Sequence, residues 1–124
     1  MDERTLRARM LLGESALDRL RNSHVAVFGL GGVGSWCAEA LARSGVGRMT
    51  LVDQDTVSVS NINRQLCALE STVGMPKAEV VARRMRAINP QAAIKCVGGR
   101  YGAAGPGRST AAYAAAGAAS DTDP

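Results

Sequence analysis

The chain has 124 residues, a formal net charge of +4 and 46% hydrophobic residues. This length suffices for one small domain, and a mildly basic chain suits a partner that carries phosphate. No stretch is long and apolar enough to span a membrane, and the N-terminus lacks the apolar core of a signal peptide. Its three cysteines have no C-x-x-C spacing, which argues against a disulfide framework or a zinc site and indicates reduced thiols in the cytoplasm.

A glycine-rich turn follows the first predicted strand. In chain order, the pattern predicts a helical region over residues 6–20, interrupted near Gly13, and a buried parallel strand over the Val-rich run 24–28. The strand leads into the spacing Gly-x-Gly-x-x-Gly, which is typical of a turn that binds nucleotide phosphates. Gly29 would make the tight turn, Gly31 would let the backbone approach phosphate, and Gly34 would let the next helix pack closely.

The helix after this turn is expected to begin near Val33 and to end near Gly45, a C-terminal glycine cap. The backbone N–H groups at its start form an anion site. Apolar residues at helical spacing predict the face that packs against the core: Val33, Trp36, Cys37, Ala40 and Leu41.

An acidic residue completes the nucleotide motif. The next predicted strand covers residues 49–52 and ends at Asp53, about 20 residues after the turn, as the motif requires. A carboxylate at this place accepts hydrogen bonds from ribose hydroxyls. The complete strand–turn–helix–strand–acid order is much more specific than an isolated Gly-x-Gly-x-x-Gly, and it favours nucleotide binding over a solvated turn.

The remaining elements predict an α/β fold. Residues 54–75 form a long loop, a length that often marks function. A helix begins near Pro76 and ends at Asn89, and a third strand covers residues 92–97. The apolar stripe of this helix is Val80, Val81, Met85 and Ile88. Its arginines are expected to lie in solvent: Arg83, Arg84 and Arg86. The order predicts a Rossmann-like βαβαβ half of a doubly wound parallel sheet.

The composition changes after residue 97. Residues 98–124 contain nine Ala and six Gly but no Leu, Ile, Val, Met, Phe or Trp. Such a segment has little apolar surface to offset its ordering entropy. We therefore expect two parts, a folded part over residues 1–97 and a mostly disordered or weakly helical tail over residues 98–124. A truncated or frame-shifted coding sequence would produce such a change.

Three segments together resemble a known family: Gly29–Gly34, Leu51–Gln65 and Val73–Lys77. They are similar to the ThiF/MoeB/HesA adenylating enzymes. Details within Arg9–Gly13, Gly34–Gly45 and Ser60–Gln65 resemble the branch of tRNA threonylcarbamoyladenosine dehydratases. The resemblance covers about residues 4–97, the N-terminal part of an ATP-binding domain.

This resemblance implies a site for ATP and Mg²⁺. It places Gly32 and the rest of the turn near the phosphates, Asp53 at the ribose, and Asn61, Arg64 and Lys77 at the phosphates. Arg64 and Lys77 are the catalytic candidates. The full set of expected nucleotide-binding residues is Gly29, Gly31, Gly32, Gly34, Asp53, Asp55, Asn61, Arg64 and Lys77. Arg9 is similar to an arginine that some relatives extend across a dimer, and no residue is assigned to the metal.

The resemblance implies an ATP-dependent dehydratase that cyclises threonylcarbamoyladenosine in tRNA through carboxylate adenylation. It also implies a homodimer in full-length relatives, a tRNA partner and a possible sulfur-transfer partner, with no membrane contact. Three alternatives stay open: a sulfur-carrier protein adenylyltransferase, an inactive nucleotide-binding fragment, and half of an NAD-binding dehydrogenase. Asp55, Asn61, Arg64 and Lys77 together argue against the dehydrogenase, because nothing in such a fold requires them.

Overall fold

A mostly parallel sheet forms the centre of the protein. The computed structural model describes residues 2–98 and the backbone of residues 113–116. Its strands are β1 (His24–Phe28), β2 (Arg48–Val52), β3 (Ala93–Val97) and β4 (Tyr113–Ala116), in the spatial order β3-β2-β1-β4. β1 pairs in parallel with β2, and β2 with β3, so that Val25 lies opposite Met49 and Met49 opposite Ile94. These three strands and their connections confirm the predicted βαβαβ half-sheet.

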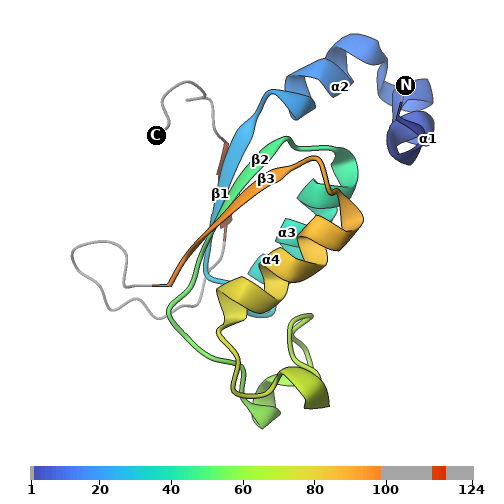
Figure 1. Ribbon diagram of the computed structural model, residues 1–124. Coiled ribbons are helices and arrows are strands. Elements are labelled where there is room, and N and C mark those ends of the chain that lie inside the picture. The colour runs from blue at the N-terminus through green and yellow to red at the C-terminus, as the bar shows by residue number, and fades with distance from the viewer. Residues whose placement is uncertain (1, 99–112, 117–124) are drawn as a thin grey trace.

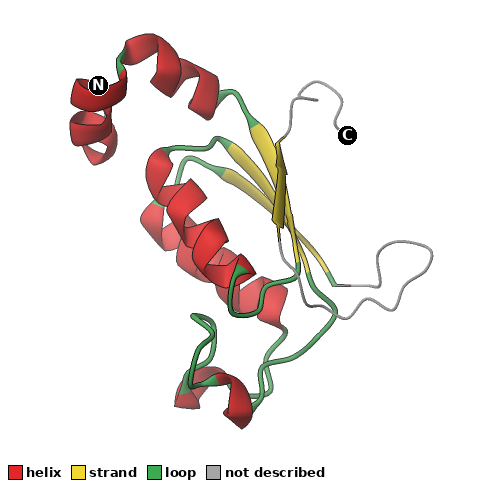
Figure 2. Ribbon diagram, turned by 180° about the vertical axis from the view of Figure 1, so that it is seen from behind, coloured by secondary structure: helices red, strands yellow, loops and turns green. Residues whose placement is uncertain are grey.

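Two helices cover one face of the sheet. α3 (Gly34–Ser44) and α4 (Lys77–Ile88) lie side by side on that face, as Figures 1 and 2 show. Burial alternates along β1, where Val25 and Val27 are buried and the residues between and beside them are partly exposed. This alternation is typical of a strand that has one face packed against the core.

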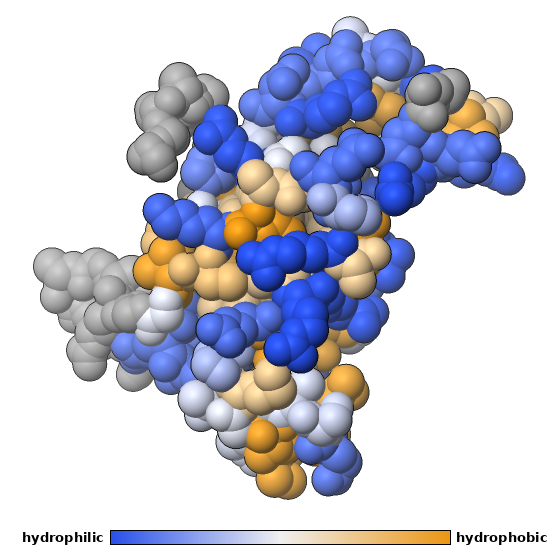
Figure 3. All heavy atoms as spheres, in the orientation of Figure 1, coloured by the Kyte–Doolittle hydropathy of each residue, from blue (hydrophilic) through white to orange (hydrophobic). Residues whose placement is uncertain are grey.

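The two ends of the sheet carry different elements. The 3₁₀ helix η1 (Glu3–Thr5), α1 (Leu6–Leu12) and α2 (Glu14–Arg21) lie at the end where the parallel strands begin (Figure 1). The loop after β2, with the 3₁₀ helices η2 (Val59–Asn61) and η3 (Glu70–Thr72), lies at the end where those strands finish. Exposed apolar side chains gather on α1 and on this loop (Figure 3).

None of the helices in the described part of the chain has the length and apolar character needed to cross a membrane.

The core-facing side of α3 differs from the predicted one. Val33 and Trp36 are 69% and 53% exposed and Ala40 is exposed as well, so the predicted face is wrong at these three positions. The buried positions of the helix are instead Gly34, Ser35, Ala38, Glu39 and Ala42. Small side chains allow a helix to approach a sheet closely, and this close approach outweighs the burial of a few larger residues.

The predicted stripe of α4 is confirmed. Val81 and Met85 are fully buried, and Val80 and Ile88 pack against the same core. Its three arginines are exposed, as predicted, and Arg84 also pairs with a carboxylate of α3.

The segment after residue 97 differs in part from the expected tail. Residues 113–116 form β4, which pairs antiparallel with β1 and sets Ala116 opposite Val25. This strand replaces the disorder or weak helix expected there, because backbone groups alone can complete the hydrogen bonding of an open sheet edge. The rest of the tail beyond Gly98 lies outside the described residues, and the boundary between residues 1–97 and 98–124 stays a prediction.

Candidate nucleotide-binding site

The glycine-rich turn joins β1 to α3. Gly29 has a φ of 89°, in the left-handed region that favours glycine, and its N–H donates to the Val52 carbonyl at 2.8 Å. Gly34 is buried at the start of α3. Val33 caps this helix without a side-chain hydrogen bond. The N–H of Ser35 donates to the Gly31 carbonyl at 3.1 Å, so an anion would meet the other N–H groups of this turn.

The loop after β2 closes over this turn. A Cβ placed on Gly31 would lie 3.5 Å from Nε2 of Gln65. One placed on Gly32 would lie 3.8 Å from both Cγ and Cδ of Arg64. The side chain of Arg64 therefore runs alongside the turn, and the two predicted phosphate-binding elements are brought together.

Asp53 ties the end of β2 to the turn. Its Oδ2 accepts the N–H of Leu30 at 2.6 Å, and its Oδ1 accepts the N–H of Asp55 at 2.8 Å. The residue is buried. The structure thus gives Asp53 a role in holding the turn that the sequence did not predict, while its contact with ribose stays a prediction. Asp55 is exposed and lies beside it.

Asn61 is a buried amide at the end of η2. Its Oδ1 accepts hydrogen bonds from the backbone N–H of Ser58 at 2.9 Å and from its hydroxyl at 3.1 Å. Its backbone carbonyl accepts the N–H of Arg64 at 3.1 Å. The amide nitrogen has no hydrogen-bond partner within residues 2–98. Asn61 therefore shapes the turn that carries Arg64, and its contact with phosphate stays a prediction.

Arg64 is exposed and has no ion pair with any described carboxylate. Its Nη1 donates to Oδ1 of Asn63 at 2.8 Å and to the carbonyl of Ser60 at 3.4 Å. These acceptors are neutral, so the positive charge of the guanidinium remains available to a phosphate.

Lys77 is the most informative residue of the site. It is the first residue of α4, and its backbone N–H donates to the carbonyl of Asp55 at 3.0 Å. The residue is only 6% exposed. In the part of the chain that the structure describes, its ammonium has neither a carboxylate nor a hydrogen-bond partner. Buried lysines are almost always paired, because an unpaired buried charge is costly.

A buried thiol links Lys77 to the turn. Burial raises the pKa of Cys67, and the nearby Lys77 ammonium partly opposes this shift. The Sγ atom of Cys67 contacts the Leu30 carbonyl at 3.9 Å. Lys77, Cys67 and the glycine-rich turn therefore lie close together at the end where the parallel strands finish.

The sequence did not identify three residues that support the site: Ser35, Gln65 and Cys67. Ser35 Oγ donates to the Gly31 carbonyl at 2.6 Å and accepts the N–H of Leu66 at 3.2 Å, so it holds turn and loop together. The only sequence signal was position, because Ser35 follows the last glycine of the motif and Gln65 follows Arg64.

Two further residues lie outside the site. Arg9 is in α1, at the other end of the sheet (Figure 1), and pairs with Glu14 at 3.6 Å. His24 is at the start of β1, where its Nε2 shares a hydrogen bond of 2.7 Å with the hydroxyl of Thr50 on β2. Neither is brought to the glycine-rich turn.

The arrangement combines backbone donors with two cations from separate elements, the loop after β2 and α4. Such a combination suits a polyphosphate, in which several negative charges lie close together. Within residues 2–98, no group of three or more His, Cys, Asp or Glu side chains is placed to hold a metal ion.

Fold and site together define a Rossmann-like α/β protein with a glycine-rich turn at the carboxyl ends of parallel strands. The chain belongs to the ThiF family, whose model matches residues 3–117.

Relatives within this group include enzymes of two kinds. The tRNA threonylcarbamoyladenosine dehydratase of Escherichia coli is 54% identical over 87 residues, which are 70% of this chain and 32% of that protein. The molybdopterin-synthase adenylyltransferase of Escherichia coli is 46% identical over 77 residues, 62% of this chain and 31% of that protein. The crystal structure of the Escherichia coli dehydratase in complex with ATP superimposes with a TM-score of 0.77 and 49% identity, over 78% of this chain and 40% of that one.

The matched part of this chain thus spans about a third of the length of the curated relatives.

Proposed function

We propose that the chain binds ATP at the turn Gly29–Gly34 and serves in the adenylation of a carboxylate. The observation that carries this proposal is Lys77, a residue near the turn that is only 6% exposed and has no ion pair with a carboxylate within residues 2–98. The triphosphate of ATP would supply the missing negative charge and offset the cost of burying the lysine. The similarity to a relative whose structure contains ATP supports the same ligand.

The proposed roles follow from the chemistry of each group. The backbone approaches the phosphates at the glycines of the turn: Gly29, Gly31, Gly32 and Gly34. Asn61 also contacts the phosphates. Asp53 accepts hydrogen bonds from the ribose and Asp55 lines the site beside it. Arg64 offers a planar fork of donors, and Lys77 offers a compact charge.

Adenylation requires little covalent chemistry from the protein. A carboxylate oxygen of the substrate attacks the α-phosphorus of ATP, the bond to the pyrophosphate oxygen breaks, and pyrophosphate leaves with its electron pair. Negative charge on the phosphate oxygens must be stabilised throughout the reaction. Arg64 and Lys77 would supply the positive charges that do this. In the dehydratase reaction a second group of the same modified nucleoside then displaces AMP and closes a ring.

We propose the carboxylate of threonylcarbamoyladenosine in tRNA as the substrate. The identity to the dehydratase, 54% over 87 residues, exceeds the identity to the molybdopterin-synthase adenylyltransferase, 46% over 77 residues. The proposal includes tRNA as partner, a homodimer for the full-length protein, and the cytoplasm as location. Mg²⁺ would accompany the phosphates of ATP, but the described residues assemble no set of metal ligands, so no step is assigned to it.

A second candidate is a sulfur-carrier protein adenylyltransferase. The similarity to the molybdopterin-synthase enzyme supports this reading, since the phosphate-binding part of the site would serve either carboxylate. A third candidate is nucleotide binding without turnover, in which the chain holds ATP but activates no substrate.

The test of nucleotide choice is calorimetric titration of the 124-residue chain with ATP, adenosine and NAD. ATP should bind more tightly than both, because only ATP places a triphosphate between Arg64 and Lys77. Arg64→Ala should weaken ATP binding, whereas Arg83→Ala, an exposed arginine on α4, serves as the matched control and should not. Tighter binding of NAD than of ATP would refute the adenylation proposal.

The test of the substrate uses a chimera in which residues 3–97 of this chain replace the matching part of the Escherichia coli dehydratase. We expect ATP-dependent cyclisation of threonylcarbamoyladenosine in tRNA. Adenylation of a sulfur-carrier protein without change in the tRNA would favour the second candidate. ATP binding with neither reaction would favour the third.

A further inference from the structure

Trp36 makes a polar contact that the proposed chemistry does not use directly. It lies in the first turn of α3, and its indole Nε1 donates to the backbone carbonyl of Arg64 at 3.3 Å. The residue is 53% exposed. Trp36 is therefore not held in place by packing in the core. Its hydrogen bond instead joins α3 to the loop that carries Arg64.

This contact constrains Arg64 from one side while the turn constrains it from the other. The indole fixes the carbonyl of the arginine, and the side chain runs past Gly32, with its Cγ and Cδ each 3.8 Å from the place of a Cβ on that glycine. A long arginine side chain loses conformational freedom when it binds an anion. Holding its backbone in place beforehand lowers that loss.

We infer that Trp36 is a positioning residue, which holds Arg64 in the orientation that meets the phosphates of ATP. The inference deepens the proposed function and rests on it. Trp36 needs no contact with the nucleotide, so its effect passes through Arg64 and concerns only ligands that carry phosphates.

The experiment is a double-mutant cycle on the full 124-residue chain, with ATP binding measured by calorimetry. Trp36→Phe keeps an aromatic ring and removes the N–H donor. It should raise the Kd for ATP about three- to tenfold, the range of one hydrogen bond, and leave the Kd for adenosine unchanged. In the Arg64→Ala background, the same substitution should change the Kd for ATP less than about twofold, because coupled residues are not additive. Leu11→Ala, an exposed apolar residue of α1 at the other end of the sheet, is the control and should have no effect.

The outcomes separate this inference from the function on which it rests. Absence of ATP binding by the unaltered chain would overturn both. If Arg64→Ala weakens ATP binding but Trp36→Phe does not, the positioning role is wrong and the proposed function stands. If Trp36→Phe weakens binding equally with and without Arg64, Trp36 acts by another route and the inference is also wrong.

A second measurement uses the unaltered chain. The chain has one tryptophan, so its indole N–H gives a single signal in a proton–nitrogen NMR spectrum. This signal should shift more on addition of ATP than on addition of adenosine. Equal responses to the two ligands, or none to ATP, would overturn the positioning role.

Discussion

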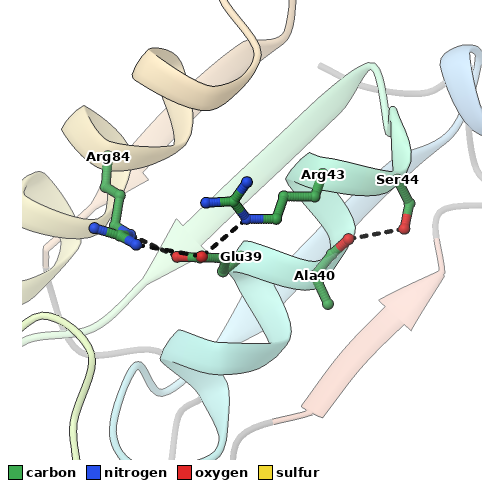
Figure 4. A network of polar contacts seen from close by, with 5 residues as sticks. All are labelled: Glu39, Ala40, Arg43, Ser44 and Arg84. Atoms are coloured by element: carbon green, nitrogen blue, oxygen red, sulfur yellow. Dashed lines mark hydrogen bonds and ion pairs between the residues drawn. The ribbon is translucent and has the colours of Figure 1, made fainter. Parts of the chain in front are cut away.

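Glu39 on α3 and Arg84 on α4 join the two helices that cover the sheet. Arg84 donates from Nε to Oε1 of Glu39 at 2.5 Å and from Nη2 to Oε2 at 3.3 Å (Figure 4). Arg43, one turn further along α3, donates from Nε to Oε2 at 2.9 Å. The hydrogen bond from Arg84 holds the pKa of Glu39 below its usual range, although burial opposes this shift. The mostly buried carboxylate is therefore charged and satisfied by two arginines.

Glu39→Gln should lower the free energy of unfolding by about 1–2 kcal/mol at pH 7, because it removes the charge from hydrogen bonds that are only partly screened by solvent. The pKa of Glu39 is lower in the folded state than in the unfolded chain. Its contribution is therefore complete above the unfolded-state pKa and declines as the pH falls through the lower folded-state pKa. Urea denaturation at neutral and acid pH measures both effects.

The matched control for this prediction is Glu79→Gln, an exposed glutamate on α4 that has no ion pair with a described residue. It should change stability by less than about 0.5 kcal/mol. If the two variants lose equal stability, or if the loss in Glu39→Gln does not diminish in acid, the bond between the helices contributes less than its geometry indicates.

Gly47 has no room for a side chain. A Cβ on this residue would lie 1.9 Å from the carbonyl oxygen of Arg21, a backbone atom that cannot turn aside. Gly47→Ala should therefore destabilise the fold by at least about 2 kcal/mol, measured by thermal or urea unfolding. Gly98→Ala is the control, since no atom lies within 4 Å of its added Cβ. An unchanged midpoint in Gly47→Ala would show that α2 and the start of β2 can separate without cost.

Cys67 should be alkylated more slowly than Cys37 in the native chain. It is buried, and burial raises its pKa, so at a given pH it holds less reactive thiolate than an ordinary cysteine. Alkylation followed by mass spectrometry should modify the partly exposed Cys37 first and reach Cys67 at a similar rate only in urea. Equal rates in the native chain would show that the loop over the turn opens frequently.

The local part of the fold was predictable from the sequence because its signals are local. Gly29 requires an unusual φ, the Val-rich strand has a recognisable composition, and Asp53 follows the next strand at a fixed spacing. Each of these features depends on residues close to it in the sequence, or separated from it by one helix. The structure places all three as predicted.

The rest depended on packing between distant segments. Apolar periodicity favoured the side of α3 that carries Trp36, but the sheet selects the side with small residues. Nothing in the local sequence indicated that Glu39 would meet Arg84, 45 residues away. The resemblance assigned Lys77 to the phosphates, and only the three-dimensional arrangement shows that the residue is buried with no ion pair to any residue that the structure describes.

Lys77→Met should separate binding from stability. Methionine has a similar length and no charge, so the substitution removes the charge of a buried residue that has no ion pair within residues 2–98. We expect the free energy of unfolding without nucleotide to stay equal or to rise, while the Kd for ATP increases at least about tenfold through the loss of a charge-assisted contact. Calorimetry gives the Kd, and urea unfolding gives the stability.

Lys95→Met removes an exposed lysine on β3 and is the matched control, which should leave both quantities unchanged. Lys77→Met should also change how much ATP stabilises the folded chain. A ligand that binds only the folded state raises stability in proportion to the logarithm of its concentration over Kd. Saturating ATP should therefore stabilise the unaltered chain more than Lys77→Met, even though the variant is at least as stable alone. A variant that loses stability without nucleotide and keeps its affinity for ATP would show that Lys77 supports the fold instead of the phosphates.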